Sequence, residues 1–174
     1  MPGRGLAAMV SVVIQIVPFS SVHQAGVIDV ILPIQQAEFG FAITVADQPD
    51  LLDIAAFYQR GRGGFWVALS DGELVGTIGL RDIGNHQGAL RKMFVKATHR
   101  GREHGVASRL LKELILFATT AQVRDIFLGT TEKFVAAHRF YEKNGFVQIA
   151  TTGLPETFPR MSLDTRFYRR VLGT

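Results

Sequence analysis

The chain has 174 residues, of which 47% are hydrophobic and 20% are charged, and it contains no cysteine. This length favours one domain with a sizeable core, and the composition argues against disorder throughout the chain. Without cysteine there are no disulfides, no thiolate zinc ligands and no cysteine nucleophile.

The net charge of +4 is unevenly distributed along the chain. Residues 1–80 carry three bases and seven acids, and residues 81–143 carry twelve bases and six acids. Residues 144–174 add four bases and two acids. A basic centre next to an acidic front half predicts an anionic partner, either nucleic acid or a small polyphosphate.

The first residues have the outline of a signal peptide, with Arg4 followed by an apolar run over residues 6–17. Gln15 interrupts this run, and no small-residue cleavage site follows it. The run is also too short for a bilayer, which takes about 20 apolar residues. We therefore predict a disordered leader over residues 1–8, a buried strand over Met9–Val17, and a single domain over residues 9–174. We expect a cytoplasmic protein.

Two helices are predicted next. A serine can cap a helix over residues 20–39, in which Pro33 predicts a kink or a break. A second helix begins at Asp47 and continues to Tyr58, and the glycines that follow end it.

The rest of the chain alternates between strands and helices. Strands are predicted over residues 65–69, 74–80, 90–95, 126–128, 146–150 and 166–171, with helices over residues 106–117 and 134–144. An Asp71-Gly72 turn joins the first two of these strands. The order β-α-α-β-β-β-α-β-α-β-β predicts an α+β fold, with a mixed sheet and helices on both faces.

The segment from residue 90 to residue 107 combines a strand, a loop and a helix start. A helix N-terminus leaves about four N–H groups unpaired and carries partial positive charge. Gly105 lets an anion approach the backbone, Ala107 keeps the first turn open, and Arg100 and Arg102 add charge. This combination predicts a diphosphate site. It is neither a Walker loop nor a dinucleotide fingerprint, because the glycine patterns of both are absent.

A second segment, residues 136–146, identifies the first one. Together the two segments resemble the GNAT superfamily of N-acetyltransferases. Arg102, Gly105 and Ala107 fill the family's [QR]-x-x-G-x-[GA] motif, and residues 141–146 match its Tyr-Glu-Lys-x-Gly-Phe ending. Residues 91–95 look like the family's fourth strand, and the order of elements fits its fold over nearly the whole chain.

The resemblance implies the GNAT fold, a mostly antiparallel sheet of about seven strands with a splay between strands 4 and 5. It implies acetyl-CoA, or another acyl-CoA, as co-substrate. The spacing of possible ligands offers no convincing metal site, so we expect no metal. The residues implied to contact it are Met93, Phe94, Val95, Arg100, Arg102, Glu103, His104, Gly105, Val106, Ala107, Phe134 and Ala137. Many relatives carry Asn at the position of Phe134, so this chain lacks that side-chain contact.

In the implied reaction, a neutral amine attacks a thioester, an oxyanion develops and a thiolate departs. A backbone N–H near Phe94 or Val95 can stabilise the oxyanion. Tyr141 is the predicted general acid, because a phenol of pKa about 10 can protonate a thiolate whose thiol has a pKa of about 8.5. Alternatively, Tyr141 only packs beside Phe134 and Ala137.

The general base is less well defined, because residues 90–95 contain no acid. The candidates are Glu38, Asp82 and His86, acting directly or through water. Glu38 follows the first helix, where acceptors often bind in the family, and His86 lies in a glycine-flanked loop with an ordinary pKa of about 6.5. Each of these two can instead be a solvated polar residue without a catalytic role.

The expected function is direct transfer of an acetyl group from acetyl-CoA to a primary amine in a ternary complex. The acceptor is a small amine or a peptide amine. The acids at 38, 47, 50 and 53 suggest a cationic acceptor, unless they cap and solvate the second helix. The alternatives are a non-catalytic acyl-CoA sensor and an acyltransferase with a longer donor. We expect neither nucleic acid nor membrane as a partner, and a homodimer could form through the strand over residues 167–172.

Overall fold

The computed structural model describes residues 12–173, so the predicted leader and the first residues of the strand predicted from Met9 lie outside the described residues. Seven strands form one sheet in the order β1-β2-β3-β4-β5-β7-β6. All neighbouring strands are antiparallel except β4 and β5, which are parallel. The predicted α+β class and mixed, mostly antiparallel sheet are confirmed.

The elements follow the predicted order. The strands are β1 (Ile14–Pro18), β2 (Gly64–Ser70), β3 (Glu73–Asp82), β4 (Gln87–Val95), β5 (Asp125–Thr130), β6 (Val147–Ile149) and β7 (Arg166–Val171). The α-helices are α1 (Gln24–Pro33), α2 (Pro49–Leu52), α3 (Ile54–Tyr58), α4 (Val106–Thr120) and α5 (Val135–Lys143). β1 begins later than predicted, because Val12 and Val13 are exposed and lie outside the sheet.

The two predicted front helices are both broken. The first consists of a 3-10 turn over Ser21–His23, then α1, then a π-helical turn over Ile34–Glu38. The break follows Pro33 as predicted, because proline has no N–H to donate to the helical ladder. The second is interrupted at Asp53, whose backbone is not helical and whose carboxylate accepts the Ala56 N–H at 3.2 Å. Asp53 therefore ends α2 and caps α3.

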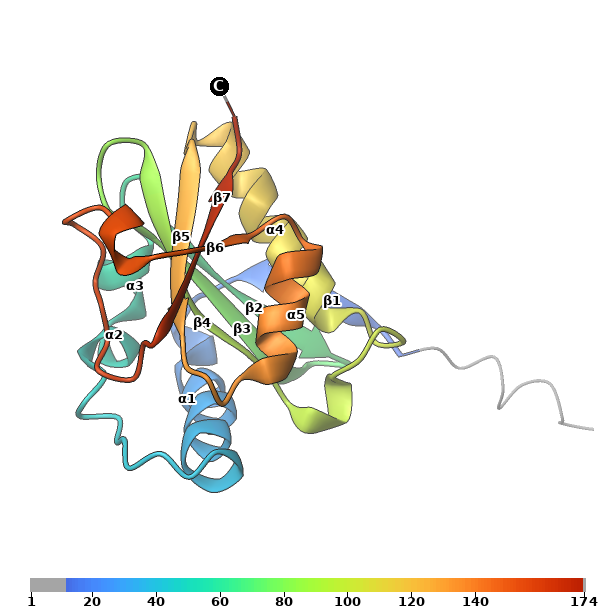
Figure 1. Ribbon diagram of the computed structural model, residues 1–174. Coiled ribbons are helices and arrows are strands. Elements are labelled where there is room, and N and C mark those ends of the chain that lie inside the picture. Colours follow the sequence, from blue (N-terminus) through green and yellow to red (C-terminus); the bar gives the residue numbers. More distant parts are fainter. Residues whose placement is uncertain (1–11, 174) are drawn as a thin grey trace, which may run out of the picture.

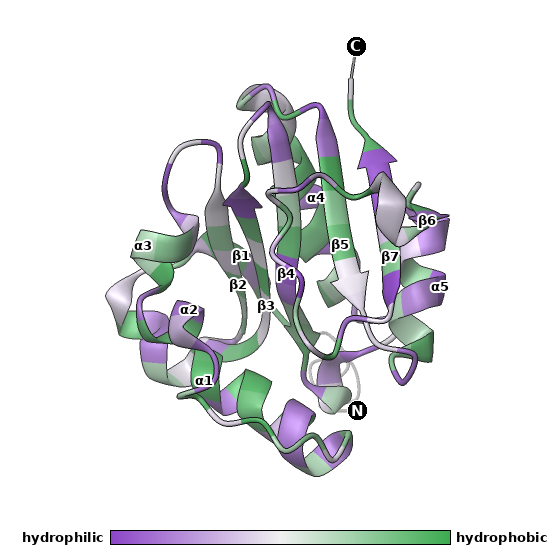
Figure 2. Ribbon diagram, turned by 60° about the vertical axis from the view of Figure 1, so that its left-hand side comes forward, coloured by the Kyte–Doolittle hydropathy of each residue, from purple (hydrophilic) through white to green (hydrophobic). Residues whose placement is uncertain are grey.

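The helices cover both faces of the sheet (Figure 1). Helices α1, α2 and α3 lie on one face, and α4 and α5 lie on the other. Alternate residues of β2 face opposite sides of the sheet. Phe65 and Val67 pack toward α1 and α3, whereas Trp66 and Ala68 pack toward α4. This alternation follows from the two-residue period of a strand. In Figure 2, β5 and α4 are hydrophobic over much of their length.

The sheet forks between β4 and β5. These strands pair only at Gln87↔Asp125, Gly88↔Ile126 and Ala89↔Phe127, after which each continues without the other. Strand β4 is also irregular against β3, where the register shifts beside Lys92, whose φ is +55°. The Lys92 carbonyl accepts the Thr77 hydroxyl at 2.7 Å, which holds the bulge. The predicted splay is therefore present, and it leaves one edge of β4 open.

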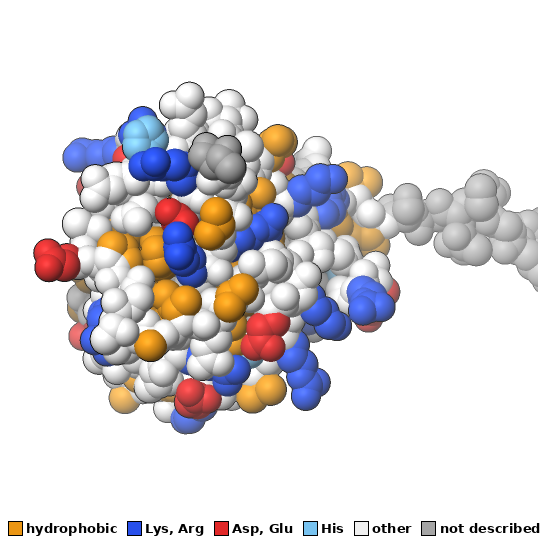
Figure 3. Space-filling view, turned by 45° about the horizontal axis from the view of Figure 1, so that its top comes forward, with side chains coloured by type: hydrophobic (Ala, Val, Ile, Leu, Met, Phe, Trp, Pro, Cys, Tyr) orange, Lys and Arg blue, Asp and Glu red, His pale blue; other side chains and the backbone are white. Residues whose placement is uncertain are grey.

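Within residues 12–173, no helix combines the length and the apolar character that crossing a membrane requires. Figure 3 shows one face of the molecule, where Lys and Arg side chains are spread among hydrophobic and neutral ones.

Candidate active site at the fork of the sheet

Two cavities meet at the fork. The large cavity, of about 640 Å³, lies between the end of β4, residues 100–105, the start of α4 and helix α5. The small cavity, of about 140 Å³, lies between β4, β5, residues 41–43 and the loop over residues 158–164. The residues that line both are Met93, Phe94, Phe134, Ala137 and Tyr141. Groups bound in the two cavities would therefore meet at these five side chains.

The large cavity contains the features of an anion site. Gly105 precedes α4 with φ +64°, and a Cβ atom there would meet only the Arg102 carbonyl oxygen, at 4.0 Å. The backbone at the start of α4 is thus open to a ligand. The basic residues lining the cavity are Arg100, Arg102, Lys133, Arg139 and Lys143, and Glu38 is the acid among its described lining residues. These residues fit a polyphosphate such as that of CoA.

Arg100 and Glu38 form an ion pair at the mouth of this cavity. Arg100 Nη2 donates to Glu38 Oε2 at 2.8 Å, and Nη1 donates to Oε1. The hydrogen bonds from Arg100 lower the pKa of Glu38, which makes its carboxylate a weaker base. Arg100 Nε also donates to the Val95 carbonyl at 2.7 Å. Glu38 therefore lines the large cavity, but its pairing with Arg100 makes it poorly suited to accept a proton as a general base.

Most of the predicted cofactor residues line the large cavity. Three do not contribute side chains to it. Val106 is fully buried in the core, since it begins the inward face of α4. Glu103 and His104 lie in the exposed turn before Gly105, with a carboxylate oxygen of Glu103 4.0 Å from His104 Nε2. For these three, only the backbone can take part in an anion site.

Phe134 stands in an aromatic cluster at the boundary of the two cavities. Its ring centroid lies 4.5 Å from that of Phe39, 5.8 Å from that of Phe41 and 6.4 Å from that of Phe94. All three contacts are edge-to-face, the arrangement that aromatic pairs favour. Position 134, where the family resemblance implies an amide, therefore holds part of an apolar wall.

Tyr141 is the buried polar residue at the boundary. It projects from α5, packs against Phe146 and Tyr168, and lines both cavities. Burial raises the pKa of its phenol, so the hydroxyl is neutral and able to donate a proton. Within the described chain its hydroxyl makes no hydrogen bond. Tyr141 therefore packs in the core, as the alternative interpretation expected, and its hydroxyl has no partner among the described residues, so it can also donate a proton.

The structure does not bring His86 and Asp82, two of the candidate bases, to either cavity. His86 lies in the turn before β4, where its Nδ1 is 2.9 Å from the Gln122 carbonyl oxygen. Roughly 25 Å of strand separates it from Phe94. The Asp82 carboxylate accepts the N–H groups of Arg62 and Gly84 at 3.0 and 2.9 Å. Neither side chain lines either cavity.

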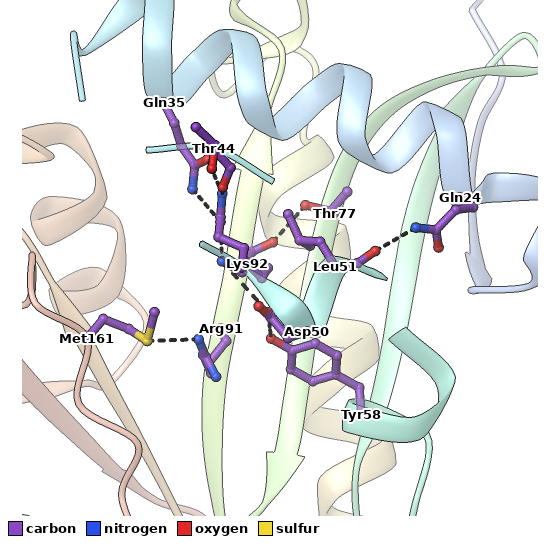
Figure 4. Close-up of polar contacts among 11 residues, drawn as sticks. Gln24, Gln35, Thr44, Asp50, Leu51, Tyr58, Thr77, Arg91, Lys92 and Met161 are labelled. Atoms are coloured by element: carbon purple, nitrogen blue, oxygen red, sulfur yellow. Dashed lines mark hydrogen bonds and ion pairs between the residues drawn. The ribbon is translucent and has the colours of Figure 1, made fainter. Parts of the chain in front are cut away.

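Beside the small cavity lies a buried charged network, of which Lys92 lines the cavity and which the sequence did not reveal (Figure 4). Lys92 Nζ donates to Gln48 Oε1 at 2.5 Å and lies 3.7 Å from Asp50 Oδ2. The Tyr58 hydroxyl donates to the same Asp50 oxygen at 2.5 Å. Burial lowers the pKa of Lys92 to about 8, although the nearby Asp50 opposes this shift. The signal in the sequence is a pair of charges, Arg91-Lys92, inside an otherwise apolar strand.

The acids of the front half serve the fold. Asp50 is buried against Lys92 and Tyr58, and Asp53 caps α3. The Asp47 carboxylate accepts both the backbone N–H and the hydroxyl of Thr44, at 2.9 and 3.0 Å. The structure therefore supports the interpretation as caps and structural partners, and not the attraction of a cationic acceptor.

Comparisons with known proteins point in one direction. The model of the family described as "Acetyltransferase (GNAT) family" matches residues 28–146. The N-acetylaspartate synthetase of Xenopus tropicalis is 36% identical over 104 residues, which cover 58% of this chain and 37% of that protein. The chain spans less than half the length of curated relatives such as this one.

Solved structures of similar proteins share the fold over nearly the whole chain. An acetyltransferase of the GNAT family from Staphylococcus aureus MU50 is 38% identical, with a TM-score of 0.88 over 92% of this chain and 100% of that chain. The PaiA N-acetyltransferase of Thermoplasma acidophilum, crystallised with coenzyme A, has a TM-score of 0.70 at 17% identity, covering 91% and 99%. This last similarity concerns the fold alone.

Proposed function

The chain belongs to the GNAT family of acetyltransferases, and on that premise we propose that it transfers an acetyl group from acetyl-CoA directly to a primary amine, with both substrates bound at once. The observation that carries this proposal is the meeting of two cavities at Met93, Phe94 and Tyr141. A donor in the large cavity and an acceptor in the small one would bring thioester and amine together there.

The donor is held by the chain's own charges and backbone. Arg102 and the open backbone at Gly105 bind the diphosphate, and the free edge of β4 at Met93 and Phe94 pairs with the amide groups of the pantetheine arm. The backbone N–H of Phe94 or Val95 on β4 stabilises the oxyanion in the proposed reaction. The family's use of CoA, seen in a neighbouring structure, supports this assignment.

Tyr141 acts as the general acid. Its hydroxyl lies at the boundary of the cavities and keeps its proton because burial raises its pKa. As the C–S bond breaks, the phenol donates to the departing sulfur, which removes the cost of releasing a free thiolate.

The acceptor is proposed to be a small amine with acidic character. This follows from the name of the relative in Xenopus tropicalis, an N-acetylaspartate synthetase, and from the limited volume of the small cavity, about 140 Å³. The cytoplasmic location and the homodimer stay predictions from the sequence.

The first test is binding of CoA, followed as a shift in melting temperature. Bound ligand stabilises a protein by about 2.7 kcal/mol at a concentration one hundred times its Kd. Gly105→Glu places a carboxylate in the diphosphate cradle and is expected to abolish the shift. Gly84→Glu is the matched control, because Gly84 also has a positive φ, +84°, with open space around it, but lies far from the fork.

The second test is thiol release from acetyl-CoA with a panel of amines. Release with at least one amine supports the proposed transfer. Binding of CoA without release from any donor would indicate a sensor, and preferred release from a longer acyl-CoA would indicate a different donor. No stabilisation by CoA in the unmutated protein would overturn the proposed function.

A further inference from the structure

Arg91 lines the small cavity, and its positive charge has only a weak hydrogen-bond acceptor as partner among the described residues. Its Nη2 donates to the Met161 sulfur at 3.1 Å, as Figure 4 shows. A thioether is a weak acceptor, whereas a guanidinium carries five N–H donors. The Arg91 guanidinium makes no other hydrogen bond to the described residues. A half-buried guanidinium with so weak a partner is suited to an anionic group of a ligand.

Asp164 places a carboxylate in the same cavity. It belongs to the loop before β7, and it packs on Gly129 of β5 so closely that a Cβ atom there would lie 2.6 Å from its Oδ2. Its Oδ2 accepts the Met161 N–H at 2.9 Å, and no described residue donates to its Oδ1. Glycine at position 129 thus makes room for this carboxylate beside the fork.

The surroundings make Asp164 a stronger base than an ordinary aspartate. Burial raises its pKa, against the positive charges of Arg91 and Lys92 on β4 and of Arg160 on its own loop. Gly129 of β5 and Phe167 of β7 also pack against this site and carry no charge. Arg91 influences Asp164 electrostatically, yet the two form no direct ion pair within the described chain. A ligand can therefore bind both.

We propose that the small cavity binds the head group of a free amino acid, with Arg91 holding its carboxylate and Asp164 holding its ammonium group and accepting the first proton. This inference rests on the proposed acetyl transfer and names the acceptor class and the base. An amine without a carboxylate would leave the Arg91 charge unpaired beside it. An anion without an ammonium group would leave Asp164 unpaired.

The proton transfers balance. Asp164 takes one proton from the ammonium, and the freed lone pair forms the C–N bond as the C–S bond breaks. Tyr141 gives its proton to the sulfur and recovers one from the nitrogen. The products are the amide and the free thiol, and Asp164 returns its proton to water.

The test compares L-aspartate, L-glutamate and L-phenylalanine with their α-amides in the thiol-release assay. The amides keep the amine and the size but lack the charge that Arg91 would bind. A charge-assisted hydrogen bond of about 1.5–3 kcal/mol predicts a preference for the acids of about 10- to 100-fold in kcat/KM. Arg91→Met should remove this preference by raising KM for the acids. Arg160→Met should keep it, because Arg160 stacks on Phe167 and does not line the cavity.

Asp164→Asn tests the base separately. It is expected to lower kcat/KM by about 10²- to 10⁴-fold and to remove the acid limb from the pH profile of kcat/KM. Stabilisation by CoA, measured on every variant, confirms that the large cavity is still folded.

Three results would overturn the inference while leaving the proposed function in place. The first is that α-amides or peptides are acetylated with the same kcat/KM as free amino acids. The second is that Arg91→Met lowers kcat/KM for the acids and for their amides by the same factor. The third is that Asp164→Asn keeps the wild-type rate and pH profile. Binding of CoA with neither turnover nor added stabilisation by any amino acid would also overturn it. Failure to bind CoA would instead refute the proposed function itself.

Discussion

Lys92 is expected to make folding stability rise with pH in the alkaline range. Its side chain is buried in the small cavity beside Asp50, and burial lowers its pKa from 10.5 to about 8. The folded chain therefore releases the Lys92 proton near pH 8, whereas the unfolded chain holds it until about pH 10.4. Between these values the unfolded state binds more protons, so the free energy of unfolding increases as pH rises.

The size of the effect follows from the difference in pKa. Each unit is worth about 1.36 kcal/mol, so stability should increase by about 2 kcal/mol between pH 8 and pH 10. Below pH 8 Lys92 is charged in both states, and its burial penalty is then fully present. Above about pH 10 the trend reverses, because the pKa of buried Tyr58 is raised in the folded chain and its phenol ionises only on unfolding.

Urea unfolding at pH 8, 9 and 10 measures this dependence. The control is the double variant Asp50→Asn with Lys92→Gln, which removes both charges and leaves neither buried alone. Its stability should be nearly flat over the same range. An equal rise in this variant, or a flat wild-type curve, would show that Lys92 is not the group responsible.

Two further predictions concern the boundary between the cavities. Tyr141→Phe keeps the packing of α5 but removes the proton donor, so kcat should fall by about 10²- to 10⁴-fold while the Kd for CoA is unchanged; an unchanged kcat would remove Tyr141 from the chemistry. Phe134→Ala opens the aromatic wall against Phe39 and Phe94, so the rate with butyryl-CoA should increase relative to acetyl-CoA. The same ratio of rates in wild type and variant would contradict a role of this wall in donor size.

Elements whose signals are local were predictable from the sequence. The apolar run of β2, the turn at Asp71-Gly72 and the break after Pro33 each depend on a few consecutive residues. The helix start at Gly105 needs a backbone with positive φ and open space, which glycine supplies. For this reason the large cavity, which is lined mainly by the two segments 93–108 and 133–144, was recognisable from the sequence.

The acceptor side was decided by tertiary structure. The contacts around it join residues that are distant in the sequence: Arg91 meets Met161 across 70 residues, and Lys92 meets Gln48 across 44. Periodicity and spacing say nothing about such pairs. In the sequence, His86 was therefore as plausible a base as Glu38 or Asp82. Only the fold left His86 outside the cavities and placed Asp164 in the small one. The sequence by itself determined the family to which the chain belongs, because its motifs are short and local. The packing of the loops around β4 determined which side chains line the small cavity, because these residues come from distant parts of the chain.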